Sequence, residues 1–342
     1  MIAGKRFGKL WTRGLPMLRR RDVLGVALAA ALAPAAGEAR AARMPFADWL
    51  EGVRREARGR GIGAATLETA LAGLSPIARV VALDRSQPEV TQTFAEYLAR
   101  RITPALIAEG RQALAANRAL LGRVRAAYGV QPRFVVALWG VETRYGRYTG
   151  GFPVIAALAT LAYDARRSDY FRRELLDALA ILDQGHVTVQ RMTGSWAGAM
   201  GQNQFMPSSF LRFAVDFDGD GRRDIWDSKA DVFASAANYL ARSGWRGDQT
   251  WGREVRLPPG LDPTLVGLET VRRLSQWQRL GVRRADGADL PRRDLPGSVI
   301  LPGGDDGPAF IVYDNYRAIL TWNRSNYFAV SVGQLADAVS GA

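Results

Sequence analysis

In residues 134–146 the chain reads Phe-Val-Val-Ala-Leu-Trp-Gly-Val-Glu-Thr-Arg-Tyr-Gly, an apolar run that ends in a single carboxylate, Glu142. Apolar side chains on every side of a helix predict that the helix is buried in the core. Pro132 suits the start of such a helix and Gly146 suits its end. We therefore predict a buried helix over residues 133–145, with its one carboxylate close to its end.

Burial gives Glu142 a possible chemical role. A poorly solvated carboxyl disfavours its anion, so its pKa rises. A carboxyl that stays protonated near neutral pH is what a general acid requires. The alternative is an ordinary helix-terminal glutamate that pairs with Arg144 or Arg147. Taken alone, the pattern favours this alternative, because structural ion pairs outnumber catalytic acids.

Residues 194–209 read Gly-Ser-Trp-Ala-Gly-Ala-Met-Gly-Gln-Asn-Gln-Phe-Met-Pro-Ser-Ser. Glycines, small residues and amides suit neither a helix nor a strand, and they predict a tight loop before a helix that begins near Pro207. The loop carries four neutral hydrogen-bonding side chains that suit sugar hydroxyls and acetamides: Ser195, Gln202, Asn203 and Gln204. The alternative is a glycine-rich structural turn. The stretch lacks the Lys-Ser/Thr pair of a phosphate loop, which argues against nucleotide binding.

Residues 216–227 read Asp-Phe-Asp-Gly-Asp-Gly-Arg-Arg-Asp-Ile-Trp-Asp. Carboxylates fall at positions 1, 3, 5 and 12 of this stretch, namely Asp216, Asp218, Asp220 and Asp227. With Gly221 at position 6, this is the pattern of an EF-hand loop, whose oxygen ligands suit calcium. Asp227 stands where glutamate is usual, and its shorter arm predicts weaker, monodentate binding. We expect a structural calcium ion, with a solvated acidic turn as the alternative.

Composition narrows the chemistry further. The chain has 342 residues, a length that suggests two domains or one large domain with an insertion. With 48% apolar and 23% charged residues it can bury a sizeable core. It contains no cysteine, which excludes disulfides, thiol catalysis, cysteine zinc sites and iron–sulfur clusters. Its single histidine, His186, excludes a histidine-rich metal site. Carboxylates are therefore the expected carriers of any chemistry, and no organic cofactor is expected.

The net charge of +13 is unevenly distributed. Residues 1–41 hold eight basic and two acidic side chains, so +6 of this charge lies there. They also contain the basic run 19–21, the apolar stretch 23–36 and the triplet Ala-Arg-Ala at 39–41. This is the layout of an export signal, and the paired arginines resemble the twin-arginine type. The alternative is a membrane anchor, but the apolar run is shorter than a span needs.

We predict that the remaining chain is mostly helical. Apolar spacing indicates helices over residues 46–53, 90–98, 104–127, 154–164 and 170–184. Ser228 and Asp231 form a candidate capping box for a helix that ends before Gly244. The β-like runs 298–301 and 310–313 lie in a stretch rich in proline and glycine. We expect a helical domain over 42–129, a core over 130–250, a β-containing part over 251–317, and a tail, 318–342, that packs back on the N-terminal helices.

Taken in order, these blocks resemble the lytic murein transglycosylases of the B type, soluble or membrane-bound. The resemblance is dense over about residues 130–245, and Asn323 and Tyr327 continue it near the end. It is carried by the stretches 141–147, 166–167 with 170–171, 195–201, 204–209, 215–217 with the calcium loop 216–227 and its residues 226–227, and 237–239.

This resemblance implies a mainly α (α+β) fold, with a lysozyme-like core, an added helical domain and a small β subdomain. It makes Glu142 the catalytic glutamate. The positions that match the glycan groove are Ser195, Gln204, Tyr170, Tyr239, Asn323 and Tyr327. The positions that match calcium ligands are Asp216, Asp218, Asp220, Arg222 through its backbone, and Asp227. Two departures stand out: the pair Gln202 and Asn203, and Trp322 where the family tends to have tyrosine.

The implied activity is cleavage of the β-1,4 bond between N-acetylmuramic acid and N-acetylglucosamine in peptidoglycan, with formation of a 1,6-anhydro end and Glu142 as the single acid and base. A hydrolytic muramidase and a non-catalytic wall-binding protein are the alternatives. We expect a periplasmic protein whose mature form has no membrane span, with partners among proteins of wall synthesis or division. A nucleic-acid partner is not expected, because much of the positive charge lies in the signal.

Overall fold

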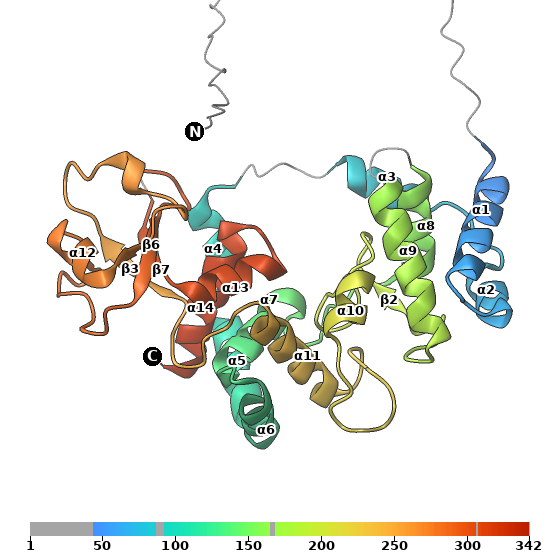
Figure 1. The fold of residues 1–342 in the computed structure, drawn as a ribbon, viewed down its shortest axis with the longest axis horizontal. Helices are drawn as coiled ribbons and strands as arrows, with labels where there is room; N and C mark the ends of the chain where they lie inside the picture. Colours follow the sequence, from blue (N-terminus) through green and yellow to red (C-terminus); the bar gives the residue numbers. More distant parts are fainter. Residues whose placement is uncertain (1–43, 87–91, 165–167, 306, 342) are drawn as a thin grey trace, which may run out of the picture. The chain divides into compact units, whose positions relative to one another are not determined.

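The computed structural model describes residues 44–86, 92–164, 168–305 and 307–341 (Figure 1). The predicted export signal in residues 1–41, together with Arg166 and Arg167, lies outside the described residues. Helices account for most of what is described. None of the described helices is both long enough and apolar enough to cross a bilayer.

Helix α7 (Pro132–Thr143) is the buried helix that the sequence predicts. All of its side chains from Phe134 to Val141 are buried. Helices pack around it from distant parts of the chain, and its main neighbours are α5 (Pro104–Ala116), α6 (Arg118–Tyr128), α11 (Lys229–Arg242) and α14 (Asn326–Ser340). These helices surround α7, which explains why it is buried on all sides.

Two helices end earlier than the sequence predicts. Helix α7 stops at Thr143 rather than at Tyr145, because Arg144 and Tyr145 take left-handed backbone angles, with φ of 49° and 59°. This turn brings the Tyr145 ring back against Trp139 of the helix. The stretch 104–127 is two helices, because the chain breaks at Asn117, whose side-chain amide donates to a carbonyl of the preceding turn.

A second group of helices contains the N-terminal part of the described chain. It consists of α1 (Phe46–Gly59), α2 (Ala64–Leu71), α3 (Ala78–Arg85), α8 (Val154–Tyr163) and α9 (Ser168–Asp183). Helix α4 (Phe94–Arg101) instead packs against α14. The helices of residues 42–129 therefore belong to two different packed groups. The domain boundary predicted at residue 129 stays a prediction.

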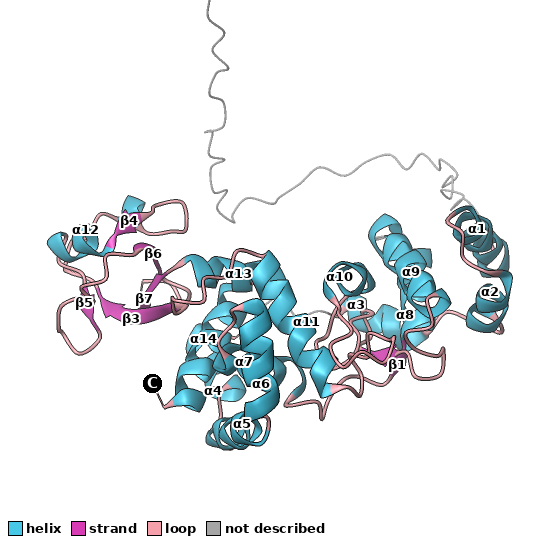
Figure 2. Cartoon of the chain, turned by 60° about the horizontal axis from the view of Figure 1, so that its bottom comes forward, coloured by secondary structure: helices cyan, strands magenta, loops and turns pink. Residues whose placement is uncertain are grey.

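Most of the strands form one antiparallel sheet with the order β4-β6-β7-β3-β5 (Figure 2). Its members are β3 (Gly252–Arg256), β4 (Arg272–Arg273), β5 (Arg283–Arg284), β6 (Pro296–Ile300) and β7 (Ala309–Val312). The helix α12 (Leu274–Arg279) lies beside it, and Trp277 is fully buried in the apolar cluster there. The two predicted β-like runs are therefore confirmed as β6 and β7.

The glycine-rich stretch forms the predicted tight loop. The short strands β1 (Phe152–Pro153) and β2 (Thr193–Gly194) pair at its start, and α10 (Pro207–Phe213) follows it. Close backbone approach explains Gly194, because a Cβ there would lie 2.1 Å from the carbonyl oxygen of Ala199.

The predicted capping box at α11 is only half formed. The Ser228 hydroxyl accepts a hydrogen bond from the Asp231 N–H, as expected. The Asp231 carboxylate does not return this bond to Ser228. It accepts from the N–H groups of Phe217 and Asp224, both at 2.7 Å. It thereby braces the stretch 216–227, which we call the acidic loop.

Candidate active site

Glu142 lies in the last turn of α7, against the end of α13 (Asp314–Trp322). The Trp322 indole Nε1 donates a hydrogen bond of 2.7 Å to its Oε1. The residue keeps some exposed surface, but protein atoms surround its carboxyl. Burial raises the pKa of Glu142 to about 7, although the Trp322 hydrogen bond and the Arg101 charge act in the opposite direction. The carboxyl is therefore neutral in a large fraction of molecules at neutral pH.

The ion pair that the sequence offered as an alternative is not formed. Arg144 binds Glu109 of α5 through Nε at 3.1 Å and Nη2 at 2.9 Å. Arg147 reaches the same carboxylate at 3.3 Å. Both arginines are thus directed to α5, and Glu142 has only the indole as a hydrogen-bond partner among the described residues.

The turn after Glu142 is held by Tyr145. Its hydroxyl donates to the carbonyl oxygen of Leu106 at 2.8 Å, which joins α7 to α5. Its ring fills the space over two glycines, because a Cβ on Gly110 would lie 2.4 Å from the Tyr145 oxygen and one on Gly140 2.7 Å from its ring. The position of Glu142 therefore depends on a close helix crossing that only glycine permits.

Two aromatic rings pack against Trp322 and hold its indole in place. Its ring centroid lies 4.8 Å from that of Tyr239 and 5.0 Å from that of Phe205. Tyr239 is only 8% exposed, and its hydroxyl donates to the carbonyl oxygen of Thr321 at 2.6 Å. The predicted groove residue Tyr239 is thus placed to hold Trp322, rather than to offer an open ring face to a sugar.

The four predicted loop side chains all have hydrogen-bond partners within the protein. Gln202 accepts from the Trp139 indole at 2.8 Å and donates to the carbonyl oxygen of Trp226 at 2.6 Å. Asn203 is buried and donates to the carbonyl oxygen of Val232. These two amides serve the fold, so the suggestion that they bind sugar is not supported. Ser195 accepts from the N–H of Ala199, and Gln204 donates to the carbonyl oxygens of Thr149 and Gly201. Both side chains remain partly exposed, and Gln204 takes a left-handed φ of 51°.

The remaining predicted groove residues lie on three different elements. Tyr170, near the start of α9, is 40% exposed. Asn323 follows directly after Trp322 and is exposed, with its side-chain oxygen on the N–H of Ser325. Tyr327 packs its ring at 5.1 Å from Phe94 of α4 and is half-buried. Trp322 therefore lies at Glu142 itself, whereas the role of the predicted groove residues in binding stays a prediction.

Three carboxylates converge at the acidic loop, two from the loop itself and one from α11. Oxygen atoms of Asp216, Asp218 and Asp231 lie within 4.8 Å of one another. Three like charges with hard oxygen donors fit a divalent cation such as calcium. Asp231 lies outside the twelve-residue pattern, so the spacing argument missed it. Its burial raises the pKa of Asp231 to about 6, and the charges of the other two carboxylates act in the same direction.

The other two predicted carboxylate ligands point elsewhere. Asp220 pairs with the Arg222 guanidinium at 2.6 Å, and Asp227 pairs with Arg191. Both side chains would have to leave these arginines to join the three converging carboxylates. The three converging carboxylates fit a hard cation, but the full set of predicted calcium ligands is not brought together.

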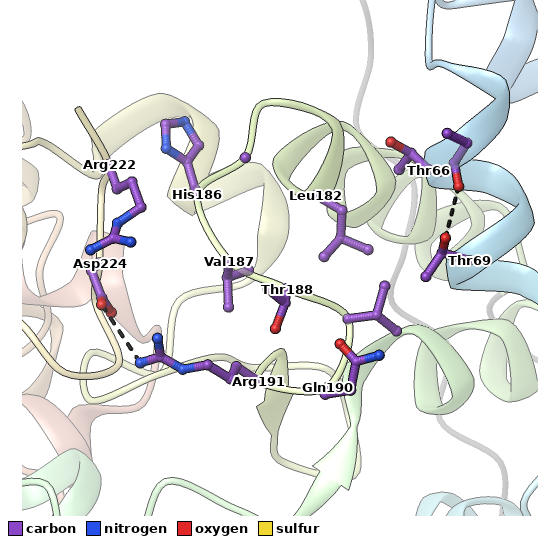
Figure 3. Close-up of a pocket in the computed structure, with 13 residues that line it drawn as sticks. Thr66, Thr69, Leu182, His186, Val187, Thr188, Gln190, Arg191, Arg222 and Asp224 are labelled. Carbon is purple, nitrogen blue, oxygen red and sulfur yellow. Dashed lines mark hydrogen bonds and ion pairs between the residues drawn. The ribbon is translucent and has the colours of Figure 1, made fainter.

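Two pockets are relevant to ligand binding. One of about 460 Å³ lies between α2 and the turn after α9, and its lining includes Thr66, His186 and Arg191 but not Glu142 (Figure 3). The second, of about 300 Å³, opens beside Glu142 between the end of α4, the start of α5 and the end of α7. We call it the arginine pocket, after its lining residues Arg100, Arg101 and Arg144. No sequence pattern indicates this pocket, since α4 and α7 are distant in the chain.

The buried helix, its single enclosed carboxyl and the helices packed around them define a mainly α, lysozyme-like protein. A family model described as the transglycosylase SLT domain matches residues 45–337, and the chain belongs to this family. The resemblance stated from the sequence is thereby confirmed. The membrane-bound lytic murein transglycosylase B of Escherichia coli (strain K12) is 36% identical over 222 residues. That match covers 64% of this chain and 60% of that protein, so the chain spans about three fifths of this relative.

Solved structures support the same assignment. SltB3 from Pseudomonas aeruginosa, in complex with NAG-anhNAM-pentapeptide, is 46% identical with a TM-score of 0.85, over 87% of this chain and 80% of that one. The Escherichia coli lytic transglycosylase Slt35, in complex with calcium, is 30% identical with a TM-score of 0.73, over 86% of this chain and 93% of that one. The predicted fold class, mainly α with a lysozyme-like core and a β subdomain, is confirmed by these matches.

Proposed function

We propose that this protein is a lytic transglycosylase that cleaves the β-1,4 bond between N-acetylmuramic acid and N-acetylglucosamine in peptidoglycan. The observation that carries the proposal is the enclosed carboxyl of Glu142, whose pKa of about 7 lets it donate a proton near neutral pH. Membership of the transglycosylase SLT domain family supports it. The relative SltB3 was solved with a muropeptide, which supports the same class of substrate.

The reaction proceeds in two proton transfers. Neutral Glu142 donates its proton to the bridging oxygen while the bond from that oxygen to C1 of muramic acid breaks and positive charge develops at C1. The C6 hydroxyl of the same sugar then forms the new bond to C1, and the Glu142 carboxylate accepts the hydroxyl proton. No water is consumed, the product is a 1,6-anhydro end, and Glu142 returns to its neutral form.

The surroundings of Glu142 favour a single carboxylate in both roles. An ordinary glycosidase places a second carboxyl group about 5–10 Å from the first. Among the described residues, Glu142 is the only acidic side chain that lines the arginine pocket or the small cavity behind Trp322. Glu109, the nearby carboxylate on α5, is held by Arg144 and Arg147.

We infer further that Ser195, Gln204, Tyr170, Asn323 and Tyr327 line the glycan groove, and that Tyr239 supports it through Trp322. A calcium ion would be held by Asp216, Asp218 and Asp231, and would brace the loop that precedes α11. The relative Slt35 was solved with calcium, which supports this proposal. The predicted N-terminal signal and the proposed cell-wall substrate together favour a periplasmic location.

The test is digestion of purified sacculi with the wild-type protein and with Glu142→Gln, followed by mass spectrometry of the released muropeptides. We expect wild type to release ends that are one water lighter than reducing ends, and the variant to lose at least about a thousandfold in rate. Reducing ends would instead identify a hydrolase. Folded wild-type protein that binds sacculi and releases nothing would favour the non-catalytic alternative.

A further inference from the structure

Gln202 joins three parts of the protein near Glu142. Its Oε1 accepts from the Trp139 indole of α7 at 2.8 Å, and its Nε2 donates to the carbonyl oxygen of Trp226 at 2.6 Å. Its backbone N–H donates to the carbonyl oxygen of Ile225 at 2.8 Å. Gln202 lies in the loop before α10, whereas Ile225 and Trp226 lie in the acidic loop. One residue therefore fastens both loops to α7.

The same residue also holds the turn that follows Glu142. The buried Thr143 hydroxyl lies 3.1 Å from the carbonyl oxygen of Gln202 and 3.2 Å from that of Trp139. It also accepts from the N–H of Gly146 at 3.0 Å. A Cβ on Gly146 would lie 2.4 Å from the Gln202 Oε1, so the amide packs directly against the turn. Because Thr143 directly follows Glu142, these contacts bear on the position of the acid.

Gln202 also borders the carboxyl itself. Glu142, Gln202 and Trp322 line one small cavity between α7 and α11. The Oε1 and the Nε2 of Gln202 both have partners, so the amide forms a fixed wall of this cavity. A side chain that forms neither bond would loosen the wall and let water reach the carboxyl. Water favours the anion, so the enclosure that keeps Glu142 neutral depends on this wall.

We propose that Gln202 is a positioning residue for Glu142, which it holds in place by fastening the end of α7 to the acidic loop. The inference rests on the proposed function, because it names the support of the acid in that reaction. Glu142 transfers the proton, whereas Gln202 sets its orientation and excludes water. Such a residue acts on the chemical step rather than on substrate binding.

Gln131 offers a matched control at the opposite end of α7. Like Gln202 it is half-buried, and its Oε1 accepts from the Trp245 indole at 2.8 Å. Its Nε2 donates to the carbonyl oxygens of Gly247 and Gln249, both at 2.8 Å. Helix α7 has 12 residues, so its two ends lie about 18 Å apart. Gln131→Met and Gln202→Met therefore remove the same kinds of bond from one helix, but only the second acts beside the acid.

The two variants are compared on soluble, uncross-linked glycan strands. We expect their urea midpoints to fall by similar amounts, because each leaves one buried indole N–H unpaired. Gln202→Met should lower kcat about tenfold with KM unchanged, because misplacement of the acid affects the transition state rather than binding. Gln131→Met should keep the wild-type kcat. Equal losses of kcat in the two variants, or no loss in Gln202→Met, would overturn the proposal.

A pH–rate profile separates positioning from general stabilisation of the fold. Water that reaches the carboxyl in Gln202→Met should lower the pKa of Glu142 toward its usual value. The alkaline limb of kcat should therefore move down by about half a pH unit. In Gln131→Met the limb should stay in place. A limb that moves in neither variant, or equally in both, would contradict the assignment.

An NMR titration distinguishes this inference from the proposed reaction. In protein labelled with ¹³C at the glutamate carboxyls, the Glu142 signal is identified by its absence from Glu142→Gln. Its titration should shift to lower pH in Gln202→Met whether or not the wild-type protein forms anhydro ends. If Gln202→Met does not fold, Trp139→Phe breaks the same bond from the indole side, and Trp245→Phe is its control. An unshifted titration in the folded variant would overturn the proposal.

Discussion

At Glu142, burial and the hydrogen bond from Trp322 shift the pKa of the carboxyl in opposite directions. Desolvation disfavours the anion, whereas an indole N–H can only donate and therefore stabilises it. The resulting pKa of about 7 is higher than the usual value of 4.5. A general acid must be protonated to work, so activity should be full well below pH 7 and fall as the pH rises through this value.

Trp322→Phe tests this balance. Removal of the N–H leaves the anion less stable, so the pKa of Glu142 should rise and the alkaline limb of kcat/KM should move up by about one pH unit. Trp322→Tyr keeps a donor of similar reach and should move the limb less. The measurement is a pH–rate profile on muropeptide substrate for all three proteins. An unchanged limb, or a move to lower pH, would contradict the role assigned to this hydrogen bond.

At the scale of elements, the crossing of α5 with α7 depends on glycine. In Gly110→Ala the added Cβ would lie 2.4 Å from the Tyr145 oxygen and 2.6 Å from Val339 of α14. We expect a loss of about 2–3 kcal/mol in the free energy of unfolding, because overpacking forces neighbouring elements apart. The turn that Tyr145 holds comes directly after Glu142, so activity should fall as well.

Gly122→Ala is the matched control for this crossing. Gly122 is a helical glycine on α6, and nothing lies within 4 Å of a Cβ built there. Alanine favours a helix over glycine, so we expect this variant to be neutral or more stable by up to about 1 kcal/mol. Chemical denaturation of the two variants makes the comparison. Equal effects would show that packing at Gly110 is not the cause.

At the same scale, calcium binding by the acidic loop can be tested through the melting temperature. Calcium binding to the folded loop should raise the melting temperature, and millimolar calcium at a site of ordinary extracellular affinity contributes about 1 kcal/mol. Asp231→Asn should abolish this rise, although Asp231 lies outside the EF-hand pattern. Asp289→Asn, at an exposed carboxylate beside Arg283, should leave it intact. A calcium-dependent rise that survives Asp231→Asn would favour Asp220 and Asp227 as the ligands that matter.

At the scale of the whole chain, Asp337 joins three distant segments. It accepts from the Trp251 indole at 2.9 Å and from Arg133 of α7 at 3.0 Å. It thus links α14 to the start of the sheet and to α7. Because Trp251 is fully buried, Asp337→Ala would leave its N–H unpaired.

We expect Asp337→Ala to lower the free energy of unfolding by about 2–3 kcal/mol. Asp286→Ala removes an exposed carboxylate that pairs with Arg284 and accepts from the N–H of Ala288, and it should change stability by less than about 1 kcal/mol. Urea denaturation of both variants is the measurement. Similar midpoints would show that Asp337 is not needed to hold the segments together.

Several features follow from the sequence because their causes are local. Apolar residues on every side predict a buried α7, glycines and amides predict the loop before α10, and β-like runs predict β6 and β7. The order of motifs points to the family, which the match over residues 45–337 shows. Each of these signals lies within a few residues of the structure that it predicts.

The errors and omissions share a different cause. Trp322 bonds to a residue 180 positions away, and Asp231 turns from capping its own helix to bracing the acidic loop. Gln202 and Asn203 look available for sugar, but they satisfy buried partners on other elements. Hydrogen-bond partners of this kind depend on which segments pack together, and neither spacing nor composition contains that information.

The sequence by itself therefore determined the helical class, the family, the candidate acid and the candidate calcium loop, because short-range periodicity and spacing encode them. Only the tertiary structure decided that Glu142 is enclosed beside an indole donor, that Arg144 and Arg147 bind Glu109, and that Arg100 and Arg101 face the acid across a pocket. The physical reason is that desolvation and charge pairing are properties of assembled surfaces, and these surfaces combine residues that are far apart along the chain.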